Sequence, residues 1–445
     1  MKKSTIIIAV IVVLAAITSW FVTRTPESAF ESTQAESKPA SAELIERGQY
    51  VAHLADCVAC HTVPNEPAFA GGLPMGTPIG AIYSTNITPD PETGIGNYSL
   101  ADFDRALRHG VAKDGDRLYP AMPFPSYEKM PDSDIEALYA YFMNDVEPVK
   151  KPNQETDIPW PLNMRWPLAF WSVMFTDSGT YEPKADQNEQ WNRGAYLVQG
   201  PGHCGSCHTP RGFAMQEKAL DESSDQFVSG ATLDGWYAPS LRNDPNSGLG
   251  RWSEEDVYQF LKNGRNEHAV VYGSMTDAFN NSTQFMTDDD LYAIAHYLKS
   301  LPGNPEKDGE PWQHKPQKVS GELAKLPGAE TYMTRCSACH GSDGMGHKPW
   351  IPPLAGATSM LVSDDSSAVN VTLNGSGRAV AHGVPDAYRM PPFRQQLSDK
   401  EIAEVLSFVR TTWGNNGGEV SVDDVKAMRE DTDPASSEVI ILQMR

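Results

Sequence analysis

The chain has 445 residues, of which 36 are Lys or Arg and 58 are Asp or Glu, so its formal net charge at pH 7 is −22. An acidic surface of this kind is unsuited to binding the phosphates of nucleic acids or anionic lipid headgroups. It suits a protein that stays monomeric or that docks onto a basic patch of another protein.

The N-terminus predicts a membrane anchor. Residues 5–22 are almost entirely apolar and lie between Lys2 and Lys3 on one side and Arg24 on the other. This stretch is long for the core of a signal peptide and short for a membrane span, and no clear Ala-x-Ala cleavage site follows it. We expect residues 1–25 to be a retained anchor rather than a cleaved signal, with the body of the protein outside the membrane. Residues 26–43, rich in Ser, Glu, Ala and Pro, are predicted to be a flexible linker.

All six cysteines fall in one motif, Cys-x-x-Cys-His, which occurs three times. This motif is the attachment signature of c-type haem, because each thiol can bond to a vinyl-derived carbon and the histidine can bind the iron. Three copies predict three covalently bound haem c groups, and such attachment takes place on the outer, periplasmic side of the bacterial inner membrane. The predicted thioether residues are Cys57, Cys60, Cys204, Cys207, Cys336 and Cys339, and the predicted iron ligands are His61, His208 and His340.

Other uses of cysteine fit this pattern less well. A structural zinc site needs ligands that converge, whereas these motifs lie far apart in the chain and each has its own histidine. A thioredoxin-like pair belongs to a βαβ pattern, which does not surround these motifs. Disulfides are possible in an exported chain, but they do not require a histidine at the same offset three times.

The sequence around each motif repeats. Residues 130–142, 286–298 and 397–409 each predict an amphipathic closing helix, with Ser, Thr or Asp at the N-cap and apolar residues at helical spacing. A further helix is expected before each motif, over residues 46–53, 191–198 and 328–333. The stretches between are rich in Gly and Pro and show few alternating strand patterns.

We therefore predict an all-α chain with extensive loops and three tandem haem domains. Domains of this size and loop content have a poor core by themselves, and a covalently held haem gives their helices an apolar plate on which to pack. The predicted domains are residues 44–147, 189–303 and 326–414, with an aromatic and Pro-rich linker over 148–188, a second linker over 304–325 and an acidic tail over 415–445.

A methionine in a loop before each closing helix is the expected second iron ligand. Met is the usual partner of His in cytochromes c, and its soft thioether favours Fe(II). Met122 and Met390 lie in Pro-rich loops that restrict the backbone, and Met275 is the candidate of the second domain. Met286 aligns with a residue that precedes the first closing helix and is expected to be structural, while Met75 is a weaker rival of Met122.

Residues 158–175 carry three Trp and two Phe between the first two domains. Their prolines and Arg165 exclude a membrane span. Two interpretations remain open: a docking surface for a partner subunit or the membrane interface, or a linker whose aromatic residues pack against both domains.

In the order of its motifs and in the residues around them, the chain resembles the three-haem cytochrome c subunit of membrane-bound bacterial dehydrogenases for alcohols, gluconate, sorbitol, fructose and aldehydes. The likeness runs from about residue 44 to 413, and its most specific stretches are 47–50, 57–62, 85–90, 118–127 and 191–211. It implies class I cytochrome c-like domains with His61, His208 and His340 as proximal ligands and Met122, Met275 and Met390 as distal ligands. The acidic tail departs from the family, whose membrane contacts lie near the C-terminus, and this favours the N-terminal anchor.

The resemblance also implies a function. In such complexes a separate flavin- or quinone-dependent subunit oxidises the substrate, and some relatives serve molybdenum dehydrogenases; the cytochrome then passes electrons to ubiquinone or a terminal oxidase. We expect an electron-transfer subunit in the inner membrane on the periplasmic side, with no catalytic residues of its own. The alternatives are a stand-alone periplasmic carrier, a cytochrome that feeds an oxidase or, less in keeping with a Met for every iron, a haem peroxidase.

Overall fold

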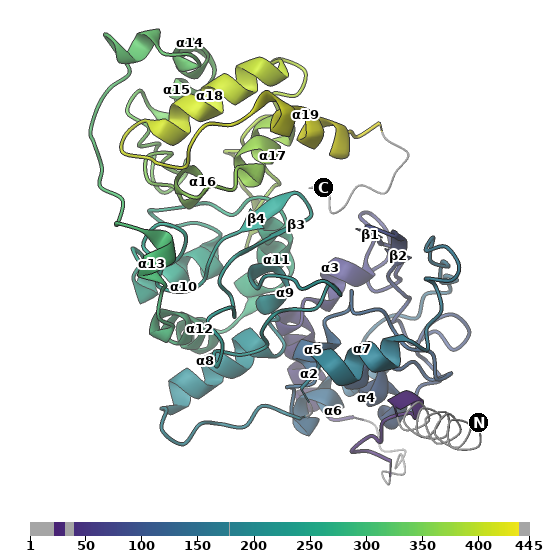
Figure 1. Cartoon of the computed structure of the whole chain (residues 1–445). Coiled ribbons are helices and arrows are strands. Elements are labelled where there is room, and N and C mark those ends of the chain that lie inside the picture. Colours follow the sequence, from purple (N-terminus) through teal and green to yellow (C-terminus); the bar gives the residue numbers. More distant parts are fainter. Residues whose placement is uncertain (1–21, 32–39, 178, 436–445) are drawn as a thin grey trace, which may run out of the picture.

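The computed structural model describes residues 22–31, 40–177 and 179–435 (Figure 1). The predicted anchor falls mainly on residues 1–21, which lie outside the described residues. Within the described ranges, no helix combines the length and the hydropathy that a bilayer span needs. The same ranges contain many helices joined by long loops and three two-stranded hairpins, which confirms the mostly helical class.

The helices fall into three groups, here called the first, second and third segments (residues 42–147, 189–303 and 326–414). In Figure 1 the third segment lies above the second, the first lies beside the second, and α9 and α11 lie at the centre. The first segment contains α2 (Ala42–Leu54), α3 (Cys57–His61), β1 (Pro74–Thr77), β2 (Gly80–Tyr83), α4 (Leu100–His109), α5 (Phe124–Tyr127) and α6 (Asp132–Asn144), and α7 (Leu168–Phe175) follows it.

The second segment has the same order of elements. It contains α8 (Glu189–Gln199), α9 (Gly205–His208), β3 (Ala231–Leu233), β4 (Trp236–Ala238), α10 (Glu254–Asn263), α11 (Met275–Asn281), η1 (Thr283–Phe285) and α12 (Asp288–Ser300). The short helices α13 (Pro305–Asp308) and η2 (Leu323–Lys325) lie in the linker that follows.

The third segment has a shorter opening helix, and its hairpin follows its middle helix instead of preceding it. It contains α14 (Ala329–Thr331), η3 (Tyr332–Cys336), α15 (Ser337–His340), α16 (Thr358–Leu361), α17 (Ser366–Asn374), β5 (Val380–Ala381), β6 (Val384–Pro385) and α18 (Asp399–Thr411). The single helix predicted before the third motif is therefore a short α-helix that continues as one π-helical turn.

A glycine lets the opening helix of each segment cross the closing helix closely. A Cβ atom at Gly48 would lie 1.9 Å from the carbonyl oxygen of Ala137 in α6, and one at Gly194 would lie 2.0 Å from that of Ala293 in α12. A Cβ atom at Gly328, just before α14, would lie 2.2 Å from the carbonyl oxygen of Glu404 in α18. Only a residue without a side chain permits this approach, and a buried hydrophobic core lies at each crossing.

Replacing Gly194 by alanine is expected to destabilise the protein, because the added methyl group meets the rigid backbone of α12. Overpacking of this kind costs about 1–3 kcal/mol, which urea unfolding would measure. The control is Gln190→Ala, an exposed site on the same helix, where a change within about 0.5 kcal/mol is expected. Equal losses in the two variants would contradict a tight crossing at Gly194.

The predicted closing helices are all present, and two begin as expected. Thr287 and Ser398 cap α12 and α18 through their hydroxyl oxygens. The predicted Ser, Thr or Asp cap is wrong for α6, where Pro131 occupies the N-cap without a side-chain hydrogen bond. Asp132 is instead the first residue of α6, where its negative charge interacts favourably with the positive N-terminal end of the helix dipole.

Each segment also has a middle helix that the sequence analysis did not predict. Capping boxes start two of them, at Ser99 with Asp102 for α4 and at Ser253 with Asp256 for α10. A glycine follows each middle helix with a positive φ, at Gly110 (59°), Gly264 (70°) and Gly375 (79°). These glycines turn the chain into the loops that carry the candidate methionines.

The start of the predicted tail also packs against the body. Helix α19 (Val422–Asp431) lies on α17 and α18, with Val425 fully buried. The guanidinium of Arg394 donates to the carbonyl oxygens of Arg429 (2.8 Å) and Thr432 (3.0 Å) at its C-terminal end. These contacts fix α19 to the third segment.

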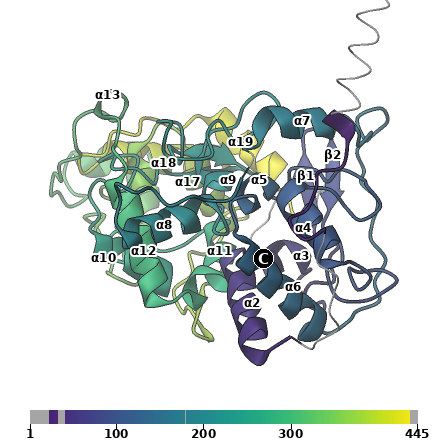
Figure 2. The same ribbon diagram turned by 90° about the horizontal axis from the view of Figure 1, so that it is seen from below.

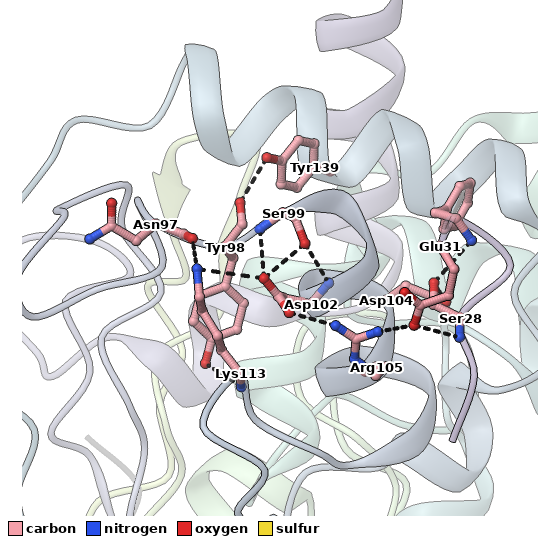
Figure 3. A network of polar contacts seen from close by, with 11 residues as sticks. Ser28, Glu31, Asn97, Tyr98, Ser99, Asp102, Asp104, Arg105, Lys113 and Tyr139 are labelled. Atoms are coloured by element: carbon pink, nitrogen blue, oxygen red, sulfur yellow. Dashed lines mark hydrogen bonds and ion pairs between the residues drawn. The ribbon is translucent and has the colours of Figure 1, made fainter. Parts of the chain in front are cut away.

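At the other end of the chain, residues 24–31 are fixed to α4 (Figure 3). Ser28 donates to Asp104 (2.6 Å), Arg105 forms an ion pair with Glu31, and Phe30 is buried. The carbonyl oxygen of Arg24 accepts a hydrogen bond from Arg117 at 3.0 Å. The predicted flexible linker therefore begins with residues that are held against the first segment.

Candidate haem-binding sites

The three Cys-x-x-Cys-His motifs form similar short helical turns, α3, α9 and α15. No disulfide joins the cysteines; the first of each motif is half-buried against a hydrophobic core, and the second is exposed. Burial raises the pKa of Cys57 and of Cys204 to about 12. The described strands form only two-stranded antiparallel hairpins, so the βαβ unit of a thioredoxin-like pair is absent around these motifs in the described part of the chain.

The histidines of the three motifs make equivalent hydrogen bonds. Nδ1 of His61 lies 2.6 Å from the carbonyl oxygen of Thr85, and Nδ1 of His208 lies 2.7 Å from that of Pro239. Nδ1 of His340 lies 3.2 Å from the carbonyl oxygen of Pro352. A carbonyl oxygen only accepts, so Nδ1 carries the proton and Nε2 is left with a lone pair.

This arrangement fits a haem iron ligand. Burial lowers the pKa of all three imidazoles, although the carbonyl contacts oppose the shift, and the neutral form is the one that binds metal. A carbonyl that holds Nδ1–H orients the ring and raises the basicity of the other nitrogen. The two thiols of each motif, one next to the histidine in sequence and one a helical turn before it, can form the covalent bonds to the porphyrin, beside an apolar core that can pack against the ring.

The structure brings two of the three predicted methionines together with their motifs. Met122 packs against the same core as Cys57, and Met390 packs against the same core as Cys336. The backbone of Met390 is held on both sides by Ser376, through bonds of 2.9 Å to its N–H and 3.0 Å to its carbonyl oxygen.

Met275 lies apart from the core of its own segment. It packs in a small cluster with Val271, Phe279 and Ala379, the last from the third segment. Helix α11, which begins at Met275, also contacts α3 of the first motif. The predicted rivals lie elsewhere: Met286 is buried in the second core, as expected of a structural residue, and Met75 lies in β1.

The first two motifs lie close together. Tyr127 donates to the carbonyl oxygen of Ala55 at 2.8 Å and packs edge-on against His203, with ring centroids 5.8 Å apart. Nδ1 of His53 lies 3.1 Å from the carbonyl oxygen of Asn281. His53 and His203 therefore both make contacts between the first and second segments.

A reciprocal polar contact joins these two segments. Asp290 of α12 accepts two bonds of 2.7 Å from Arg193 of its own segment and one of 2.6 Å from Tyr50 of the first segment. In the mirrored arrangement, Asp134 of α6 accepts from Arg47 (2.6 Å) of its own segment and from Tyr196 (2.5 Å) of the second segment.

The opening helices α2 and α8 share an Arg-Gly-x-Tyr pattern, whose role in joining the segments the sequence analysis missed. Its arginine binds the closing helix of its own segment, its glycine permits the helix crossing, and its tyrosine binds the closing helix of the neighbouring segment. The third segment has Pro327 and Glu330 at the arginine and tyrosine positions, so it cannot form the same contact.

Comparison with known proteins agrees with this geometry. Residues 192–302 and 326–413 match the cytochrome c family model. The cytochrome c subunit of the quinone alcohol dehydrogenase of Gluconacetobacter polyoxogenes is 50% identical over 411 residues, which are 91% of this chain and 88% of the relative. The chain belongs to the family of dehydrogenase cytochrome c subunits.

Two further members of this cytochrome family support the assignment. The gluconate 2-dehydrogenase cytochrome c subunit of Pantoea cypripedii is 48% identical over 403 residues, covering 87% of this chain and 90% of the relative. The fructose dehydrogenase cytochrome subunit of Gluconobacter japonicus is 39% identical over 416 residues, covering 88% and 85%. The predicted resemblance is confirmed, and family membership implies covalently bound haem c.

Proposed function

We propose that this cytochrome c subunit takes electrons from a partner dehydrogenase subunit that oxidises a CH–OH or aldehyde donor, and passes them to ubiquinone or a terminal oxidase. The observation that carries the proposal is the threefold repetition of a Cys-x-x-Cys-His turn whose histidine has Nδ1 on a backbone carbonyl. The printed names of the relatives, which are subunits of alcohol, gluconate and fructose dehydrogenases, supply the partner class.

The proposal includes three haem domains, one for each segment. Haem iron, when bound, exchanges one electron between Fe(III) and Fe(II). The residues of the chain that would hold and tune it are the cysteine pairs, through thioether bonds to the ring, and the iron ligands, which would be Nε2 of His61, His208 and His340 and the sulfur of Met122, Met275 and Met390. The contact of α11 with α3 supports close placement of the first and second haems.

Two measurements test this function. The haem content per chain is expected to be three, and two when Cys57 and Cys60 are both replaced by serine; a wild-type content of two would contradict the three-domain proposal. The protein is also expected to co-purify with a dehydrogenase subunit and to become reduced when that subunit receives its substrate. Recovery from membranes without any dehydrogenase would favour a stand-alone carrier.

The separate position of Met275 gives the rival enzyme function a specific test. A haem peroxidase needs an iron with an open or displaceable distal ligand. Our proposal assigns a methionine to every iron, so we expect the spectra of the ferrous protein with and without carbon monoxide to be the same. Substantial carbon monoxide binding at one haem would favour an enzyme over an electron carrier.

We also propose that the face formed by α7 and the loop before it lies on the membrane, together with an N-terminal anchor. Trp171 packs on Phe124 and donates to the carbonyl oxygen of Ala214, but Trp160 is 79% exposed and Trp166 is 56% exposed. This supports the docking interpretation over a linker that buries its aromatic residues. Indole rings favour the interface between bilayer and water.

The position of the N-terminal residues supports the same orientation. Arg165, in the loop before α7, donates to the carbonyl oxygen of Arg117, and Arg117 donates to that of Arg24. Figure 2 shows α7 beside the start of the described chain. The described chain therefore starts near the exposed aromatic surface, which supports a common orientation of that surface and the proposed anchor toward the membrane.

Replacing Trp160 and Trp166 together by serine, in a chain shortened to residues 22–445 so that the proposed anchor does not hold it, is expected to weaken binding to vesicles of neutral phospholipid about tenfold, because two interfacial aromatic rings are lost. A flotation assay would measure the bound fraction. The control is Val422→Ser, an exposed apolar site on α19, which should bind like the wild type. Unchanged vesicle binding accompanied by loss of the dehydrogenase subunit would instead make this face a protein contact.

A further inference from the structure

Arg265 occupies an unusual position where the second segment meets the third. It follows Gly264 at the end of α10, and its side chain is only 10% exposed. Its Nη2 atom lies 2.7 Å from a carboxylate oxygen of Asp386, which is 5% exposed, and its guanidinium lies 4.6 Å from the centre of the Trp350 ring. Both contacts belong to the third segment.

The other end of the same guanidinium lacks a partner. Nη1 of Arg265 is buried and makes no hydrogen bond, and it is the only charged donor in this condition among the residues that the structure describes. A buried N–H of a charged group is costly when it is unpaired. The guanidinium fork is suited to carboxylates, which accept its parallel N–H groups.

The two partners of Arg265 come from the two loops that also contain residues of the predicted third haem site. Trp350 lies two residues before Pro352, whose carbonyl oxygen accepts the Nδ1 proton of His340. Asp386 lies four residues before Met390, the candidate ligand of the opposite face. Trp350 and Tyr388 also approach each other, with ring centroids 6.0 Å apart, so the two loops meet beside Arg265.

We propose that Nη1 of Arg265 donates to a propionate of the haem attached at Cys336 and Cys339. This inference rests on the proposed function, because it assumes a haem at the third motif. The propionate supplies the carboxylate that the buried N–H requires, while Asp386 and Trp350 hold the guanidinium in place. A residue of the second segment thereby recognises the haem of the third segment and adjusts its reduction potential.

The sign of the effect on potential follows from charge. A guanidinium near the haem disfavours the ferric form, which carries one more positive charge than the ferrous form. Its removal therefore favours Fe(III) and lowers the potential of that haem. Removal of the neighbouring carboxylate of Asp386 has the opposite effect.

The test is a spectroelectrochemical titration of the full haem-loaded chain and its variants. Arg265→Gln is expected to lower the reduced-to-oxidised ratio of one haem about tenfold at fixed potential, which equals about 59 mV for a one-electron couple. Arg265→Lys keeps the charge and should retain most of the potential, and Asp386→Asn should raise it. Repeating Arg265→Gln in a Met390→His background identifies the affected haem, because the same redox step must then carry both shifts.

Several outcomes would overturn the assignment. An ion pair that merely joins the segments predicts that Arg265→Gln and Asp386→Asn lower stability alike and shift no potential. A shift that instead follows Met275→His would place the propionate on the second haem. A wild-type chain with fewer than three haems would overturn the three-domain proposal on which this inference rests, whereas three haems with an unmoved potential would overturn only the role of Arg265.

Discussion

Replacing Met390 by histidine is expected to lower the midpoint potential of one haem by on the order of 0.1 V or more, within the range of about 0.8 V that axial ligands span. The two other midpoints are expected to stay in place. The thioether of Met stabilises Fe(II), whereas imidazole is a harder donor that favours Fe(III). The effect is confined to one site because Met390 packs in the core of the third segment with Cys336.

A redox titration followed by absorbance would resolve the three steps. Met130→Leu is the control, because Met130 is fully buried in the first core and is not a predicted ligand. That variant should change stability and leave every potential unchanged. Equal shifts of all three haems in Met390→His would contradict the assignment of one methionine to each segment.

Replacing Asp290 by alanine is expected to cost about 3 kcal/mol of unfolding free energy, the lower end of the range for removing one partner of a buried ion pair. The lower end applies because the pair is not fully buried: the Arg193 side chain is 31% exposed, although that of Asp290 is 10% exposed. The change leaves Arg193 without its bidentate partner and Tyr50 without its acceptor. It is therefore expected to loosen the contact between the first and second segments.

Chemical denaturation of the haem-loaded protein would measure this loss. The matched control is Glu401→Ala, since Glu401 has the same register in α18 but only completes the capping box of Ser398. That change removes only the bonds from Ser398 to the Glu401 carboxylate, while the Ser398 hydroxyl still accepts from the backbone N–H of residue 401, so it should cost at most about 1 kcal/mol. A similar cost in both variants would contradict the role of Asp290 between segments.

The same contact predicts a dependence on acid. Burial acts to raise the pKa of Asp290, but bonds from Arg193 and Tyr50 and the nearby arginine charges outweigh it, so the pKa lies below its usual value. The stability from this carboxylate is therefore complete above the unfolded pKa of about 4 and is lost as the pH falls through the lower folded value. Asp290→Asn should show a smaller loss of stability than the wild type over that interval, in unfolding curves recorded at successive pH values.

Parts of the fold escaped prediction although their local signals were present. Ser99 and Asp102, and Ser253 and Asp256, have the spacing of capping boxes, and a glycine follows each of those helices. The Asp234-Gly235 pair between two short apolar runs indicates the β3–β4 hairpin, and both residues have positive φ values. Both helices have ten residues and pack on other helices, α4 on α5 and α6 and α10 on α12. They escaped prediction because each is flanked by stretches rich in Gly and Pro, which favour a loop when only the local sequence is considered.

The sequence by itself determined the haem motifs, the opening and closing helices and the family. These properties depend on residues close together in the chain: a five-residue motif fixes two thiols and an imidazole on one turn, and a helical repeat fixes an apolar face. These local patterns can be recognised without knowing how the rest of the molecule folds.

Only the tertiary structure decided how the repeats are joined. Tyr50 and its acceptor Asp290 are 240 residues apart, and Arg265 and Asp386 are 121 apart. From sequence alone, a tyrosine or arginine at such a position cannot be distinguished from an ordinary surface residue, because its partner lies far away in the chain. Their roles follow from burial, which makes each polar group require a hydrogen bond that only a distant segment can supply.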